Sequence, residues 1–117
     1  MNKIISFTFA ANYNALNELL TYLANLLQIT FEARDSSYSG NYQKANFDNG
    51  TIMVYPNFNE SENEWKYEEY KDCKYLIGVR IEKGKKVERV EKEKFFEDAF
   101  SKKGFKLVFR AETPVNS

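Results

Sequence analysis

Residues 41–56, NYQKANFDNGTIMVYP, decide the fold of this 117-residue chain. Two runs of strand-forming residues, 41–47 and 51–55, lie on either side of a short polar break. The break contains Asn49 and Gly50, a pair that readily adopts the positive φ angles of a tight hairpin turn. This is the strongest local signal in the sequence, and it predicts a β-hairpin.

The second strand of this hairpin has a clear pattern and a clear end. Ile52 and Val54 alternate with Met53 and Tyr55, so an apolar pair points to each side of the strand. Apolar residues on both sides predict a strand that is covered on both faces. Pro56 has no N–H to donate, and it is expected to end the hydrogen-bonded run.

Four further strands are expected outside the hairpin. In most of them apolar residues alternate with polar ones, the period of two that is typical of a half-buried strand. These strands cover residues 3–9, 29–34, 75–81 and 105–114, and Leu76 interrupts the alternation of the third. In the last strand the apolar side consists of Phe105, Leu107, Phe109 and Ala111.

Two helices are also predicted. Leucines at helical spacing form one apolar stripe over residues 13–27, and phenylalanines form another over about residues 91–103. Gly104 follows the second stripe, where a glycine commonly ends a helix. Residues 87–90, just before that helix, are interpreted as a short return strand.

Together these elements predict a single α+β domain over residues 1–117. Its sheet is expected to be mostly antiparallel, with about five or six strands and two helices, because short turns rather than helical crossovers join most of the strands. A chain of this length buries enough surface to form a core without disulfides.

The composition excludes several kinds of chemistry. The chain has no histidine, which removes Ser-His and Cys-His nucleophile pairs and nearly every zinc or iron site. Its one cysteine, Cys73, has no disulfide partner within the chain and is expected to be structural rather than reactive. The five glycines are widely spaced, so no phosphate-binding glycine loop is present. We therefore predict a protein that is not an enzyme, with no catalytic residue, cofactor or metal.

Charge and hydropathy limit the partners and the location. The 17 basic residues balance the 17 acidic ones, and a net charge of zero argues against direct nucleic-acid binding. No run approaches the ~18 apolar residues that a membrane helix needs, and the first residues lack a signal-peptide pattern. The single cysteine fits a reducing compartment. A cytoplasmic protein with no membrane partner is expected.

The charge is unevenly distributed along the chain. Residues 1–58 carry a net charge of −1, residues 59–72 carry −4 and residues 73–117 carry +5. The basic part mixes its lysines with glutamates, which is typical of a solvated surface rather than a phosphate-binding face. The acidic part contains Trp and Tyr, which often anchor protein interfaces. Its predicted partner-binding residues are Glu60, Glu62, Glu64, Trp65, Tyr67, Glu68, Glu69, Tyr70 and Asp72.

The acidic segment has two other interpretations. It can be a solvated loop whose aromatic residues pack into the protein's own core. Alternatively, its carboxylates can hold Mg²⁺ or Ca²⁺, since hard cations prefer oxygen ligands. The spacing of an EF-hand, with its central glycine and terminal glutamate, is absent from residues 57–72.

Two stretches, FTFAANYNALNELL (residues 7–20) and FDNGTIMVYPNFNESENEW (residues 47–65), give the chain a family resemblance. It resembles the immunity proteins of bacterial contact-dependent growth inhibition systems, particularly those that guard against nuclease toxins. The resemblance implies a cytoplasmic antitoxin that binds the cognate toxin domain, a basic nuclease, and covers its active site or substrate face. In some members of this type the toxin donates a β-hairpin that extends the sheet of the immunity protein.

Two alternative functions stay open at this stage. One is a metal-dependent hydrolase or nuclease that uses only carboxylates and lysines, which metal binding and loss of activity in Glu→Gln variants would support. The other is a small regulatory adaptor protein, which the sequence does not separate from an immunity protein.

Overall fold

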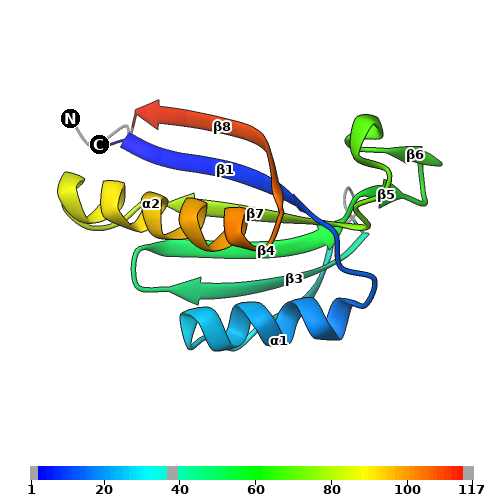
Figure 1. Ribbon diagram of the computed structural model, residues 1–117, viewed down its shortest axis with the longest axis horizontal. Coiled ribbons are helices and arrows are strands. Elements are labelled where there is room, and N and C mark those ends of the chain that lie inside the picture. Colours follow the sequence, from blue (N-terminus) through cyan, green and yellow to red (C-terminus); the bar gives the residue numbers. More distant parts are fainter. Residues whose placement is uncertain (1–2, 37–39, 115–117) are drawn as a thin grey trace.

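The computed structural model describes residues 3–36 and 40–114. Six strands form one sheet in the order β2-β3-β4-β7-β1-β8, and every pair of neighbours is antiparallel (Figure 1). The strands are β1 (Lys3–Ala11), β2 (Glu32–Ser36), β3 (Gly40–Phe47), β4 (Gly50–Pro56), β7 (Tyr75–Ile81) and β8 (Lys106–Pro114). The predicted α+β class, with a mostly antiparallel sheet and two helices, is confirmed.

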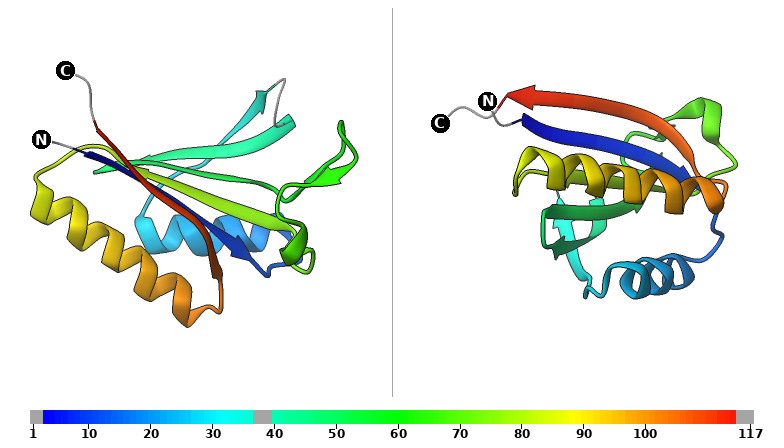
Figure 2. Two further views of the ribbon diagram at one scale, coloured as in Figure 1. Left: turned by 90° about the horizontal axis from the view of Figure 1, so that it is seen from above. Right: turned by 60° about the vertical axis from the view of Figure 1, so that its left-hand side comes forward.

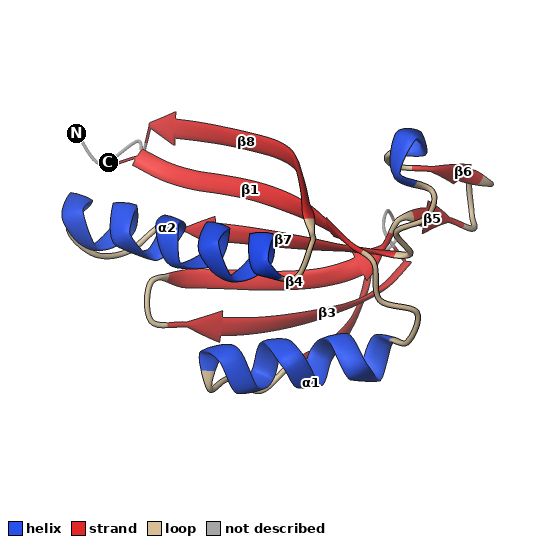
Figure 3. Ribbon diagram, viewed as in Figure 1, coloured by secondary structure: helices blue, strands red, loops and turns tan. Residues whose placement is uncertain are grey.

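Both helices, α1 (Leu16–Leu27) and α2 (Lys86–Lys102), pack on the same face of the sheet (Figures 2 and 3). Between the helices and the sheet lies the main core, which is rich in phenylalanine. Phe7 and Phe9 of β1 contact Phe96 and Phe100 of α2 at ring-centroid distances of 5.8 and 5.1 Å. Their mutual tilt is the edge-to-face geometry that aromatic pairs prefer. The strand at residues 3–9 and the phenylalanine stripe therefore meet as the patterns predict.

The predicted hairpin forms, but its glycine has a different function from the one expected. Phe47 pairs with Gly50, so Asp48 and Asn49 make the two-residue turn. Neither Asn49 nor Gly50 has a positive φ. A Cβ built on Gly50 would lie 1.8 Å from the carbonyl oxygen of Arg80 in β7. Glycine is needed here because two strands approach closely, and not because the turn requires its φ angle.

Helix α2 begins earlier than predicted, and the short return strand proposed for residues 87–90 is wrong. The carboxylate of Glu88 accepts a hydrogen bond from the backbone N–H of Lys85 at 2.9 Å, which satisfies one free donor at the helix start. The buried stripe of the first turns consists of Arg89 and Glu93 rather than apolar residues. An apolar pattern therefore could not reveal them. Gly104 ends the helix as predicted, with φ +78°.

The second predicted strand starts later than its pattern suggests. β2 begins at Glu32, whereas Ile29 and Phe31 lie in the connection from α1 and pack against the main core. Gln28 ends α1 in the left-handed region, with φ 54°, and this turns the chain back toward the sheet. The alternation at residues 29–34 thus reflects core contacts of a connecting segment as well as a strand.

The face of the sheet opposite the helices is only partly covered, so the prediction that β4 is covered on both faces is wrong for part of the strand. Met53 is 36% exposed, whereas its neighbour Tyr55 is half-buried, so only one end of β4 is covered on both faces. In β8 the register with β1 shifts between Thr8 and Phe9, where a β-bulge inserts an extra residue. Leu107 and Phe109, which the sequence places on one apolar side, therefore point to opposite faces of the sheet, and they are 46% and 47% exposed.

Candidate functional site

Between β4 and β7 the chain leaves the sheet and forms a small projecting unit, residues 57–74, which we call the acidic lobe (Figure 1). It contains a two-stranded sheet and a short 3-10 helix. These elements are β5 (Phe58–Asn59), β6 (Glu64–Trp65) and η1 (Glu68–Tyr70). The lobe lies at one end of the long axis of the molecule, and the start of α2 lies at the other.

One buried side chain, Asn57, holds the acidic lobe together. Asn57 is fully buried, and its Nδ2 donates hydrogen bonds to the carbonyl oxygens of Tyr67, Tyr70 and Cys73 at 3.2, 3.0 and 3.1 Å. Its Oδ1 accepts a hydrogen bond from the backbone N–H of Tyr67 at 2.9 Å. The amide therefore acts as both donor and acceptor, and it fixes the part of the lobe from Tyr67 to Cys73.

The backbone of Asn57 adds two more hydrogen bonds across the base of the lobe. Its N–H donates to the carbonyl oxygen of Lys74 at 2.8 Å, and its carbonyl accepts from the N–H of Lys66 at 2.8 Å. The sequence pattern does not reveal the importance of this residue. Its neighbour Pro56 marks the end of β4, but nothing in the local sequence indicates that an asparagine there would bind three distant carbonyls.

All six predicted acidic residues lie on the surface of the lobe, and most of them lack a cationic partner. Of these six residues, only Glu68 forms an ion pair within residues 3–36 and 40–114, with Lys71 at 3.3 Å. The exposed carboxylates are those of Glu60, Glu62, Glu64, Glu68, Glu69 and Asp72. With six carboxylates and three lysines, the lobe therefore carries a net negative charge.

Two of these carboxylates crowd each other. A hydrogen bond with the carboxyl group of Glu62, together with the repulsion from its charge, raises the pKa of Glu64 above its usual value. Two carboxyl groups form such a hydrogen bond only when one of them holds a proton. An approaching lysine or arginine would relieve this repulsion, so the pair favours a cationic partner.

The three predicted aromatic residues occupy different surroundings. Tyr67 and Tyr70 are half-buried and pack against a second apolar cluster, formed by Ala10, Cys73 and Leu76. They attach the lobe to the sheet face that the helices leave uncovered. Trp65 instead packs edge-on against Phe58 at a centroid distance of 5.1 Å, within the lobe's own hairpin.

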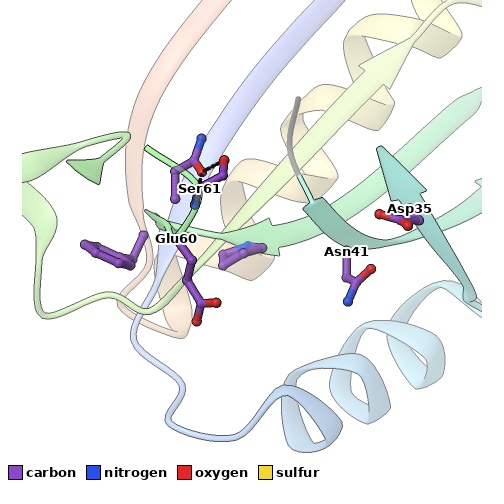
Figure 4. A pocket seen from close by; sticks show the side chains of 7 residues that line it. Asp35, Asn41, Glu60 and Ser61 are labelled. Atoms are coloured by element: carbon purple, nitrogen blue, oxygen red, sulfur yellow. Dashed lines mark hydrogen bonds between the residues drawn. The ribbon is translucent and has the colours of Figure 1, made fainter. Parts of the chain in front are cut away.

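A groove of about 620 Å³ runs along the foot of the acidic lobe (Figure 4). Asp35 and Asn41, which pair across β2 and β3, form one side. Glu60 and Ser61 of the lobe form the other side. Two carboxylates from distant parts of the sequence thus border the same groove. The position of Asp35 across the groove from the lobe was not predicted, because only the folded sheet brings these two segments together.

Asn59 shapes the rim of this groove. Its Oδ1 accepts hydrogen bonds from the backbone N–H of Ser61 at 3.1 Å, from the Ser61 hydroxyl at 2.8 Å and from the N–H of Glu62 at 3.3 Å. This is a local turn in which an asparagine side chain replaces a backbone acceptor. It fixes the turn that carries Glu60 and Glu62.

Cys73 lies beneath the lobe. It is 4% exposed, and burial, followed by the charge of Asp72, raises the pKa of its thiol. A reactive cysteine needs the opposite shift, because the thiolate is the nucleophile. In the described part of the chain, no three His, Cys, Asp or Glu side chains gather in a way that could hold a metal ion.

Comparison of the chain with models of protein families, with curated proteins and with solved structures finds no match. Neither of the two helices described is long and apolar enough to cross a membrane.

Proposed function

We propose that this chain is a cytoplasmic immunity protein that binds a cognate bacterial toxin domain of the nuclease type and neutralises it without catalysis. The observation that carries the proposal is the acidic lobe. Five of its six exposed carboxylates have no ion-pair partner among the described residues, and a buried asparagine holds the lobe in one shape.

The charge of the lobe suits a nuclease partner. A nuclease holds the phosphates of its substrate with lysine and arginine, so its substrate face is basic. Clustered carboxylates complement such a face, and they speed the encounter with it by long-range attraction. Lys66, Lys71 and Lys74 of the lobe, and Lys106 near Cys73, offset part of this charge. The six carboxylates of the lobe outnumber its three lysines, so the lobe keeps a net negative charge.

The rigidity of the lobe also favours binding. Ordering flexible side chains and loops on association costs free energy, and a surface that is already fixed avoids part of that cost. Asn57 fixes the base of the lobe and Asn59 fixes its turn. The groove between Glu60 and Asp35 then offers a site where a basic side chain of the toxin can insert between two carboxylates.

A second contact of the same complex is available at the sheet edges. β2 and β8 are the outer strands of the six-stranded sheet, and each has one unpaired side. A β-hairpin from the toxin could add to such an edge through backbone hydrogen bonds. β2 borders the groove through Asp35, so a strand added there would lie beside the acidic lobe.

The decisive experiment is rescue of cells from a toxin domain, sought at the C-terminus of a secreted protein encoded by a neighbouring gene. Cells that express the domain alone should stop growing, and co-expression of this chain should restore growth through a one-to-one complex. If the purified proteins do not bind and growth is not restored, the proposed function is wrong.

Variants then locate the surface on this protein. Replacing Glu62 and Glu64 with Gln should slow association several-fold at low salt, because steering depends on charge. The matched control replaces Glu91 and Glu97, two exposed residues of α2, with Gln. Equal association rates for the two double variants would exclude the acidic lobe as the binding surface.

Trp65 is the best aromatic residue for the same test, since Tyr67 and Tyr70 also stabilise the fold through the second apolar cluster. If Trp65 is an anchor, W65A should weaken the complex by ~2 kcal/mol or more. An unchanged dissociation constant would show that Trp65 lies outside the interface.

A further inference from the structure

The start of β1, the first turns of α2 and the end of β8 come together at the end of the molecule opposite the acidic lobe (Figure 1). Residues of all three elements line a small pocket. Its volume is about 120 Å³, several times what a single water molecule needs. The lining residues are Lys3, Ile5, Lys86, Arg89, Val90 and Glu112.

Arg89 is the unusual member of this pocket. It is only 4% exposed, and one Nη donates to the backbone carbonyl of Lys3. Its Nε–H is buried and has no hydrogen-bond partner among the residues that the structure describes. No carboxylate of that part of the chain forms an ion pair with it.

Arg110, a neighbouring arginine, has the carboxylate partner that Arg89 lacks among the described residues. Arg110 of β8 makes two hydrogen bonds to the carboxylate of Glu93, at 2.5 and 3.0 Å, and lies 3.4 Å from Glu112. Glu93 is one turn further along α2 than Arg89. A buried guanidinium without such a partner is costly, because it has lost water without gaining a counter-charge. An anion bound in the pocket beside Arg89 would compensate the positive charge of its guanidinium.

The charges around the pocket indicate which anion fits. Lys3, Lys86 and Arg89 supply three positive charges, and Glu112 is the single acid, already shared with Arg110. The excess of about two positive charges matches a phosphate group, which carries about −1.5 to −2 at pH 7, better than a carboxylate.

The position of the pocket on α2 supports the same ligand. Lys86 is the first residue of the helix, and Lys85 precedes it. Lysines at a helix N-terminus oppose the helix dipole, so these residues do not serve helix stability. The same dipole attracts a bound anion, and phosphates commonly occupy such positions.

We propose that this pocket binds a phosphate group, either inorganic phosphate or the phosphate of a small monoester. Arg89, which lines the pocket, supplies the buried guanidinium, and the ammonium groups of Lys3 and Lys86 close the site from the solvent side. This site is independent of the acidic lobe and of the proposed function.

The direct test follows the side-chain Nε–H signal of Arg89 by NMR in the uniformly ¹⁵N-labelled full chain. Sodium phosphate is added at constant ionic strength, with sodium chloride as the balancing salt. The Arg89 signal should move in a saturable way, whereas the Arg110 signal, which already has its carboxylate partner, should stay nearly in place. An Arg89 signal that does not respond to phosphate, or that moves equally in sodium chloride alone, would overturn the proposal.

Two exposed lysines of α2 provide a matched pair of variants. K86Q removes a charge at the pocket and should weaken phosphate binding roughly threefold. K94Q removes a similar charge from the same helix, outside the pocket lining, and should leave binding unchanged. Equal phosphate affinities for these two variants would mean that phosphate does not occupy this pocket.

The ligand itself is tested with three anions. Inorganic phosphate and glycerol phosphate distinguish a free phosphate from one carried on a small molecule, and saturable binding of either supports the site. Acetate should bind more weakly than both, since it carries one charge. Acetate binding as tight as phosphate binding would contradict the charge argument.

Stability gives a readout that does not depend on signal assignment. Phosphate should raise the thermal midpoint of the native protein by mass action. R89M keeps much of the buried volume without the charge, and its midpoint should not respond to phosphate. If R89M does not fold, the K86Q and K94Q pair still decides the matter.

Discussion

Replacing Asn57 with Ala is expected to release the acidic lobe from the sheet. The substitution removes an amide that is fully buried and that makes four side-chain hydrogen bonds, three as donor and one as acceptor. It leaves the carbonyl oxygens of Tyr67, Tyr70 and Cys73, and the N–H of Tyr67, without these partners.

The size of the effect follows from these contacts. A typical hydrogen bond contributes ~1 kcal/mol, and a buried group that loses its partner pays ~1–3 kcal/mol. Two donor hydrogens shared among three carbonyls count as fewer than three full bonds. The expected loss for N57A is therefore ~3 kcal/mol, a large fraction of the ~5–15 kcal/mol that stabilises a domain of this size.

The matched control is Asn59→Ala. The Asn59 side chain makes three hydrogen bonds, all as acceptor, and their donors belong to Ser61 and Glu62, which are exposed. Water replaces these bonds when they are lost, so N59A should cost less than ~1 kcal/mol.

Urea unfolding measures the two free energies, and amide hydrogen exchange shows where the structure opens. In N57A the N–H groups of Lys66, Tyr67 and Cys73 should exchange much faster, whereas those of β1 and β7 should stay protected. If N57A and N59A destabilise the protein equally, or if the lobe amides of N57A stay protected, the inference that Asn57 holds the lobe is wrong.

Three further predictions test other parts of the structure. Gly50→Ala should destabilise the protein by several kcal/mol, because its Cβ would overlap a β7 carbonyl, whereas Gly104→Ala should cost only ~1 kcal/mol through its positive φ; similar melting temperatures would refute this contrast. Glu64 has a raised pKa when folded, so folding favours its protonated form, and the charged form destabilises the protein above that pKa. E64Q should therefore be more stable than the native chain at pH 7. The difference in melting temperature between the two should vanish in acid, at a pH below the pKa that Glu64 has in the unfolded chain. Cys73 should react with a thiol reagent far more slowly at pH 7 in the folded protein than in urea, since the folded thiol is buried and its pKa is raised; equal rates would contradict its placement.

Much of the fold follows from short-range patterns. The alternation at residues 75–81 places Ile77, Val79 and Ile81 on one face, and all three are buried in the main core. The leucine stripe of α1 packs Leu19 and Leu23 against the same core. These patterns succeed because a strand repeats every two residues and a helix every 3.6 residues. The spacing of apolar residues therefore predicts which face is buried.

The local patterns fail where a contact depends on distant residues. The first turns of α2 bury Arg89 and Glu93, so they carry no apolar stripe, and residues 87–90 resemble a strand. In β8 every second residue from Phe105 to Ala111 is apolar, yet a bulge against β1 puts Leu107 and Phe109 on opposite faces of the sheet, where both are exposed. The residues that alter these patterns lie in other strands, so the local sequence of either segment does not predict them.

The candidate sites show the same division. The sequence by itself determined where the acidic residues of 59–72 cluster and that histidine chemistry is absent, because composition and order need no fold. Only the tertiary structure decided that Asn57 binds three carbonyls, that Asp35 faces the lobe across a groove and that Arg89 is buried without a carboxylate. Burial, distance and counter-charge are properties of residues far apart in the chain, and they exist only once the sheet has brought those residues together.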